Sequence, residues 1–194
     1  GAGRSNGVGY GLIAAGATSA CLLEPFVAFD AARDAALRES SPAFAAVDPR
    51  KLRRVRDFSQ IADASIDLIL SNSVLEHVRE PRAFFAECRR VLVPGGAMLH
   101  RVDYRDHFFK YPYAFLTFSD ATWSHWLDPG DLPRWRLGDH LTELGAAGFE
   151  VRVLDRGSDP AAFAKVRDRL RGRFAEAVSD VDATGAVLFA RRIV

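Results

Sequence analysis

The sequence predicts an α/β protein built on a doubly wound, mostly parallel sheet. Two observations lead to this fold class. Short apolar segments of strand length alternate with longer segments whose apolar residues repeat at helical spacing, and this alternation is typical of parallel sheets with helical crossovers. The run "IDLILS" at residues 66–71 is rich in aliphatic side chains, as expected of a central parallel strand covered on both faces.

Proline and glycine mark the limits of the helical segments. Pro42 closes the first, Pro94-Gly95-Gly96 ends the segment that begins near Pro81, and Gly148 stops the next, because proline cannot continue a helix and glycine favours its end. The expected strands are residues 19–24, 51–57, 66–71, 97–102, 149–155 and 185–192. The expected helices lie within residues 25–40, 80–96, 138–149 and 160–178.

Composition indicates one ordinary globular domain over residues 1–194. Hydrophobic residues make up 48% of the chain, charged residues 26%, and the net charge is +1. These values favour neither nucleic acid nor a membrane as a partner. Cys21 and Cys88 fall in apolar segments and are expected to be buried free thiols. With no signal peptide and no membrane-length apolar run, we expect a cytoplasmic protein.

The chain opens on a glycine-rich stretch, "GAGRSNGVG". Glycines between a strand and a helix allow positive φ and let the backbone approach a ligand closely. Glu24 ends the next strand 21 residues after Gly3, and an acid at that place can accept hydrogen bonds from both hydroxyls of a ribose. The alternative is that Glu24 caps a helix beginning near Pro25. The five basic residues between Arg50 and Arg56 are interpreted as a solvated surface.

Five segments in this order resemble class I S-adenosylmethionine-dependent methyltransferases, specifically the type 11 methyltransferase group. They are "GAGRSNG", "LLEPF", "DASIDLILSNSVLEHV", "FFAECRRVLVPGGAMLH" and "AAGFEV". The block from Asp63 to Gly96 is the most specific part of the resemblance. It implies a Rossmann-like sheet with an antiparallel last strand, S-adenosylmethionine as cofactor, and methyl transfer to a small-molecule acceptor.

The resemblance also implies where the cofactor would lie. The glycine turn would face its methionine and ribose part, the acid after the next strand its ribose, an acid and its neighbour the adenine, and the Ser/Asn turn the methyl-donor site. The residues at these places are Gly1, Ala2, Gly3, Glu24, Pro25, Asp57, Phe58, Ser71, Asn72 and Ser73.

Three features depart from the family pattern. Ser5 stands where the commonest turn has its third glycine, and the spacing from Asp57 to Asp63 is shorter than usual. No strand precedes Gly1, so the first strand of the sheet is expected to be missing. We therefore expect a fragment of a longer protein that binds the cofactor weakly by itself.

Candidate catalytic residues follow the fourth and fifth strands of the family's sheet. A proton must leave a hydroxyl or ammonium acceptor, and an imidazole can take a proton near neutral pH. We therefore consider His77, Asp103 and His107 as catalytic candidates. The alternative for His77 is a histidine that braces a loop, and His100 is interpreted as a core residue. The spacing of His100, Asp103 and His107 matches no strong metal-ligand pattern, so no metal is expected.

Residues 104–126 hold nine of the chain's 21 aromatic side chains. This stretch interrupts the alternation of strands and helices, and we expect an aromatic cap insertion at about 104–136 that excludes water from an acceptor. The alternatives are a small satellite core or a homodimer interface.

Two other functions are considered. The first is a methyltransferase-like module that binds a ligand or a partner without catalysis. The second is a nicotinamide-dependent dehydrogenase, whose fingerprint requires glycine at the sixth position of the turn, where this chain has Asn6. The sequence therefore favours a methyltransferase over a dehydrogenase.

Overall fold

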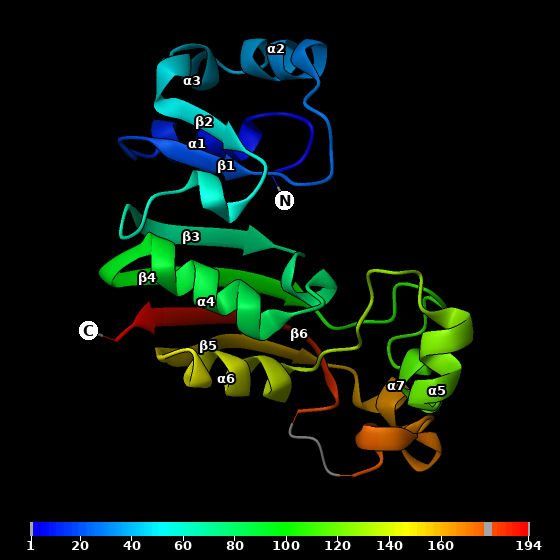
Figure 1. Cartoon of the computed structure of the whole chain (residues 1–194). Helices are drawn as coiled ribbons and strands as arrows, with labels where there is room; N and C mark the ends of the chain where they lie inside the picture. Colours follow the sequence, from blue (N-terminus) through cyan, green and yellow to red (C-terminus); the bar gives the residue numbers. More distant parts are fainter. Residues whose placement is uncertain (1, 177–179, 194) are drawn as a thin grey trace. The chain divides into compact units, whose positions relative to one another are not determined.

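Strands and helices alternate in the computed structural model as the sequence predicts (Figure 1). The structure describes residues 2–176 and 180–193. It divides into two compact units, Gly1–Ala62 and Asp63–Val194. None of the described helices is long and apolar enough to cross a membrane.

The first unit is built on two parallel strands, β1 (Ala20–Leu23) and β2 (Leu52–Val55), with Ala20 opposite Leu52. Its helices are α1 (Gly7–Ala14), α2 (Ala31–Glu39) and α3 (Pro42–Ala45), and its 3-10 turns are Pro49–Lys51 and Phe58–Gln60. Helix α1 packs closely on the strands, because a Cβ at Gly9 would lie 2.9 Å from the Leu52 side chain. Glycine is the residue that this contact accommodates.

Helix α2 begins later than predicted. The expected helix within residues 25–40 starts at Ala31, where the Asp30 carboxylate accepts a hydrogen bond from the Arg33 backbone N–H at 2.9 Å. An aspartate at this place satisfies a backbone donor that the helix leaves free. Phe26 and Phe29 matched the helical spacing but are exposed and lie before the helix.

The second unit contains a four-stranded sheet in the order β3-β4-β6-β5. The strands are β3 (Ile66–Asn72), β4 (Leu92–Asp103), β5 (Phe149–Ser158) and β6 (Ala183–Arg192). Strand β3 is parallel to β4, whereas β6 is antiparallel to both β4 and β5. The expectation of an antiparallel last strand is confirmed, and so is the mixed α/β fold.

Helices α4 (Pro81–Val91) and α6 (Leu137–Ala146) lie on the same side of this sheet (Figure 1). Helix α6 ends as predicted at Gly148, whose φ is +79°. Strand β3 is not covered on both faces as expected, because Leu68 and Leu70 are 49% and 37% exposed. Side chains alternate between the two faces of a strand, and these two leucines share the face opposite to the buried Met98 and His100 on β4.

The aromatic segment builds a small core of its own with residues 160–174. Its short elements are Ala114–Thr117, Asp120–Thr122 (α5), the π-helical turn Trp123–Leu127, Pro160–Ala164 (α7), Arg167–Arg169 and Gly172–Phe174. The buried members of this core are Tyr113, Phe115, Leu116, Trp123, Leu132, Leu170 and Phe174. The continuous helix expected over 160–178 is wrong within the described residues, because Leu170 is extended and Gly172 has φ +56°. Residues 177 and 178 lie outside them.

One buried arginine joins this segment to the sheet. The Arg136 guanidinium is fully buried and donates to the carbonyl oxygens of Tyr104 at 2.5 Å and Val181 at 2.8 Å, and also to that of Ala183. Burial lowers the pKa of Arg136 to about 10, so the side chain remains charged at neutral pH. A fixed cation therefore binds carbonyl groups just after β4 and at the start of β6.

Replacing Arg136 with leucine is expected to lower the free energy of unfolding by about 2–5 kcal/mol, because buried carbonyl groups lose a charged donor. Chemical denaturation measures the loss. The control is Arg82→Leu, since Arg82 is 80% exposed and pairs with Glu143, and this change should cost about 1 kcal/mol or less. Equal losses in the two variants would contradict the role of Arg136.

Candidate functional site

The glycine turn is anchored by the acid that follows β1. The Gly3 backbone N–H donates to Glu24 Oε2 at 2.6 Å, and Gly3 has φ +72°. The Ala2 N–H donates to the Leu23 carbonyl oxygen at 3.0 Å, so the turn runs beside the end of β1. Gly1 lies outside the described residues. The structure thus brings together Gly3 and Glu24, which the sequence paired only by spacing.

Glu24 also organises the residues that follow it. Its Oε1 accepts the backbone N–H groups of Phe26 and Val27, both at 3.1 Å. Burial alone would raise the pKa of Glu24, but these donors and Gly3 lower it overall, which keeps the carboxylate ionised. No helix begins at Pro25, so the helix-cap alternative is wrong. A carboxylate has about four acceptor positions, and three are occupied, which leaves about one for a ligand hydroxyl.

Arg54 fixes the other side of the turn. It donates to the carbonyl oxygens of Gly3 at 2.6 Å and Ser5 at 3.1 Å, and its guanidinium lies 5.1 Å from the centre of the Phe29 ring. The interpretation of the basic run 50–56 as a solvated surface is therefore wrong for Arg54. The alternation of the strand β2 was the available signal, because Arg54 lies on the opposite face from Arg53 and Val55.

Asp34 on α2 is a second turn-holding residue that the sequence did not reveal. It is buried and accepts the Asn6 backbone N–H at 2.5 Å and the Tyr10 hydroxyl at 2.6 Å. Asn6 directly precedes α1, so Asp34 ties the start of that helix to α2. An acid between the alanines of α2 was the only sign of this role.

The remaining predicted residues of the first unit are held less firmly. Pro25 is exposed, and Asp57 is an exposed residue whose Oδ1 accepts the Ser59 N–H at 2.8 Å. Asp57 thereby caps the 3-10 turn that begins at the half-buried Phe58. Asp57 and Phe58 lie just after β2, which ends at Val55. The Glu24 N–H donates to the Val55 carbonyl oxygen at 2.9 Å. The acids after β1 and β2 therefore emerge at the same edge.

In the second unit, the predicted methyl-donor segment lies where β3 ends. Ser71 Oγ is 2.6 Å from His100 Nδ1, and His100 is fully buried. Burial lowers the pKa of His100 to about 4, so the imidazole is neutral. Asn72 is exposed, and Ser73, at φ +52°, donates its N–H to the Arg101 carbonyl oxygen at 2.9 Å. His100 is a core residue, as interpreted, and it also positions Ser71.

The three catalytic candidates form one cluster at the carboxyl ends of β3 and β4. The ring centres of His77 and His107 are 5.4 Å apart, and His107 Nε2 is 3.6 Å from Asp103 Oδ2. The side chains of both histidines are about one-third exposed, at 35% and 34%. Arg105 donates to both Asp103 oxygens, at 2.9 and 2.6 Å. Burial by itself would raise the pKa of Asp103. The hydrogen bonds and the charge of Arg105 outweigh burial, and the pKa is lowered to about 2.

A loop contact determines the tautomer of His77, that is, which ring nitrogen carries the hydrogen. Its Nδ1 lies 2.8 Å from the Asp131 carbonyl oxygen, which can only accept, so Nδ1 carries the hydrogen. In the neutral ring the lone pair is then on Nε2. The loop-bracing alternative is correct for one nitrogen of His77, and the other nitrogen is a possible base.

Glu76, next to His77, was not singled out as a site residue. Its side chain is buried, and neither carboxylate oxygen has a hydrogen-bond partner. Among the described residues, no group of three or more His, Cys, Asp or Glu side chains could hold a metal ion. The cluster of His77, Asp103 and His107 is therefore a set of groups that can take up and release protons.

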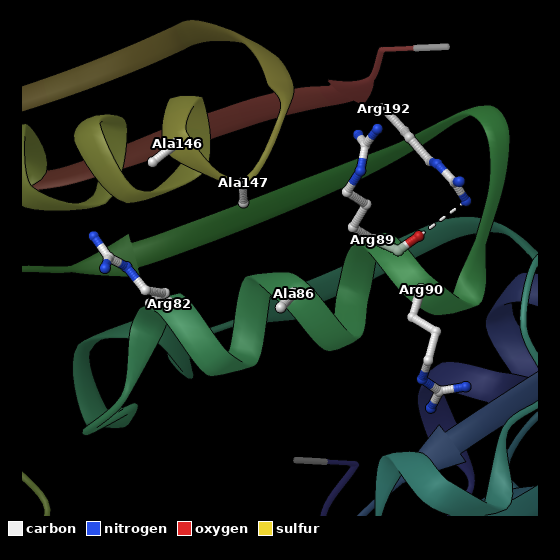
Figure 2. Close-up of a pocket in the computed structure, with 7 residues that line it drawn as sticks. All are labelled: Arg82, Ala86, Arg89, Arg90, Ala146, Ala147 and Arg192. Atoms are coloured by element: carbon white, nitrogen blue, oxygen red, sulfur yellow. Dashed lines mark hydrogen bonds between the residues drawn. The ribbon is translucent and has the colours of Figure 1, made fainter.

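A hollow of about 700 Å³ lies elsewhere in this unit, beside α4 and the end of α6 (Figure 2). Its lining residues are Arg82, Ala86, Arg89, Arg90, Ala146, Ala147 and Arg192. The arginines already bind acceptors: Arg89 donates to the Gly148 carbonyl oxygen at 2.7 Å and Arg192 to that of Arg89 at 3.0 Å. Arginine does not exchange its proton near neutral pH. We therefore place the candidate site at the strand ends.

Comparison with known proteins shows what the domain is similar to. Residues 6–100 match the family model described as "Methyltransferase domain". An S-adenosylmethionine-dependent methyltransferase from Mesorhizobium loti has a similar fold, with a TM-score of 0.50 at 19% identity over 95% of this chain and 87% of that chain. Residues 6–100, just under half of the chain, therefore match a methyltransferase domain, and the fold of the chain is similar to that of an S-adenosylmethionine-dependent methyltransferase.

Other relatives of this methyltransferase domain differ in what they do. Human "Thiol S-methyltransferase TMT1B" is 28% identical over 119 residues, which are 60% of this chain and 46% of that protein. The chain thus spans about half the length of this curated relative. The cyclase SpnF shares the fold, with a TM-score of 0.55 at 19% identity over 94% of this chain and 69% of that chain. The fold alone therefore does not define the reaction.

Replacing Arg54 with alanine is expected to speed hydrogen exchange of the Gly3 and Asn6 backbone amides about 10- to 100-fold, because charged hydrogen bonds worth about 1.5–3 kcal/mol are lost from the turn. Hydrogen exchange detected by NMR measures this. The control is Arg53→Ala on the same strand, since Arg53 is exposed. If exchange at Gly3 and Asn6 were the same in both variants, Arg54 would not hold the turn.

Proposed function

We propose that this protein transfers a methyl group from S-adenosylmethionine to a small-molecule acceptor. The observation that carries the proposal is the cluster of His77, Asp103 and His107 at the strand ends of a methyltransferase-family domain. We also propose that the two units form one such domain, since the family match runs across their boundary at Ala62.

The cofactor would be held by the glycine turn and by residues at or just after the ends of three strands, β1, β2 and β3. The residues that we assign to it are Gly1, Ala2, Gly3, Glu24, Pro25, Asp57, Phe58, Ser71, Asn72 and Ser73. Two observations support a fit: the position of a Cβ on Gly3 has no atom within 4 Å, and Glu24 has about one acceptor position left. When bound, S-adenosylmethionine supplies an electrophilic methyl group on its sulfonium.

The chain's own groups would handle the acceptor's proton. His77 Nε2 has the lone pair of a base, and His107 lies beside it. The ionised Asp103 stabilises positive charge that develops on His107. Alignment of acceptor and methyl group, with exclusion of water, supplies the rest of the rate.

Residues 104–136 would cover the acceptor as an aromatic cap. The loop at 128–131 is fastened beside His77, since Arg79 donates to the Gly130 carbonyl oxygen at 2.6 Å and to Asp128 at 2.6 Å. The exposed Tyr111 and Trp126 of the cap would provide the contact for a homodimer, which sedimentation velocity tests. A thiol is one acceptor to test first, because the human relative is named for it.

The proposal is tested by calorimetry with S-adenosylmethionine and its demethylated product, followed by transfer of labelled methyl to panels of thiols, hydroxyl compounds and amines. Binding that is lost in Glu24→Ala, together with labelled product, is the expected result. Absence of binding to both cofactor forms would overturn the proposal. Binding without transfer to any acceptor would favour the ligand-binding module instead.

With an accepted substrate, His77→Gln is expected to lower kcat about 100-fold, because glutamine can keep the contact to Asp131 but has no basic nitrogen. The control is Glu143→Gln on α6, which lies outside the cluster and the cap and pairs with Arg82, and its kcat should be unchanged. An unchanged kcat in His77→Gln would show that His77 is not the base.

A further inference from the structure

Glu76 is a buried carboxylic acid for which the fold provides no hydrogen bond. It lies in the 3-10 turn Leu75–His77, which contacts β4, and its exposed fraction is 3%. Neither Oε1 nor Oε2 has a hydrogen-bond partner. Buried polar groups are nearly always paired, so such a group calls for an explanation.

Asp106 in the same unit shows what a bracing carboxylate looks like. It is also buried, and it accepts the backbone N–H groups of Phe108, Phe109 and Phe115 at 2.7–2.8 Å. Glu76 makes no such bond and therefore lowers stability in its ionised form. A purely structural role does not account for a carboxyl at this position.

The titratable groups around Glu76 are those of the catalytic cluster. Burial raises the pKa of Glu76. The charges of His77 and His107, and the dipoles of two nearby backbone N–H groups (its own and that of Asp103), lower the pKa by less. Neither N–H meets the carboxylate with the length and angle of a hydrogen bond. From the other side, the negative charge of Glu76 acts on the buried Tyr104 hydroxyl. Glu76 adjoins His77 in the turn Leu75–His77, that turn contacts β4, and the His107 ring centre is 5.4 Å from that of His77. The carboxylate therefore belongs to the same cluster of charges.

We propose that Glu76 is a positioning residue of this site, the buried counter-charge that stabilises the His77–His107 pair once an imidazole has taken the acceptor's proton. This inference rests on the proposed function. It also defines the acceptor class: a nucleophile that loses a proton on methylation, such as a thiol, a hydroxyl or an ammonium group.

The step balances as follows. The acceptor's bond to hydrogen breaks, its electrons stay on the acceptor atom, and the proton goes to an imidazole. For an ammonium group this proton loss comes first, since it supplies the lone pair. A lone pair of the acceptor atom forms the new bond to the methyl carbon, and the carbon–sulfur bond breaks with its electron pair remaining on sulfur. The resulting imidazolium lies near the Glu76 carboxylate, and attraction between opposite charges is strong where water is excluded.

The first test needs no activity. Because the folded-state pKa of Glu76 is raised above its ordinary value of 4.5, ionisation opposes folding, and wild-type stability is lost as pH rises through that raised pKa. Glu76→Gln is therefore expected to raise Tm at pH 7.5 by about 2–4 °C. At pH 4 the difference should nearly disappear. A lower Tm of Glu76→Gln at both pH values would overturn the proposal, because it is the result for a bracing side chain.

Two further measurements make this test specific. Glu143→Gln makes the same chemical change on α6, where the carboxylate is paired with Arg82, and should not raise Tm at pH 7.5. Glu76→Met, which removes the polar group altogether, should give the same higher Tm at pH 7.5. A double-mutant cycle of Glu76→Gln with His107→Gln at pH 6 reports the pairing. We expect a non-zero coupling free energy, and its absence would overturn the assignment.

The catalytic consequence is measured separately. With a thiol acceptor, Glu76→Gln should lower kcat about 10-fold or more with little change in the KM of the cofactor, and Glu76→Asp should restore part of it. An unchanged kcat would overturn the proposal. If the wild-type protein methylates no acceptor, the proposed function fails, whereas the stability measurements still decide whether Glu76 is an unpaired charge coupled to the histidines.

Discussion

The parallel pairing of β3 with β4 is the constraint on which the candidate site depends. Parallel neighbours must be joined by a crossover, here α4, so both strands end at the same edge of the sheet. His77 follows β3, whereas Asp103 and His107 lie at the end of β4 and just beyond it. The crossover therefore brings His77 beside Asp103 and His107, which follow it in the chain by 26 and 30 residues, and the contact between the His77 and His107 rings follows from that geometry.

Arginine side chains donate hydrogen bonds to backbone carbonyl groups in turns and at the ends of helices and strands. Arg54 binds carbonyl groups of the glycine turn, Arg136 those of the segments beside β4 and β6, and Arg192 those at the end of α4. A guanidinium has five donors in a rigid plane, so one side chain can satisfy several carbonyl groups. This use explains why buried or half-buried arginines occur among the described residues of this chain.

Two buried glutamates show how surroundings decide what a carboxylate does. Glu24 receives three backbone N–H groups, which lower its pKa and make it a fixed anion beside the glycine turn. Glu76 receives none, and burial raises its pKa. The same functional group is thus a rigid anchor in one unit and a responsive charge in the other.

The sequence by itself determined the class of fold, the order of the elements and the strand-end location of His77, Asp103 and His107, because these depend on local periodicity and on the topology of parallel strands. It also located Gly148 as a helix end. It did not determine that Asp30 starts α2 at Ala31, that residues 160–174 form short turns, or that Arg54 and Asp34 hold the glycine turn. Nor did it show that Glu24 accepts three backbone N–H groups whereas the carboxylate of Glu76 has no hydrogen-bond partner. Only the tertiary structure decides these points, since burial and hydrogen-bond partners come from residues far apart in the chain.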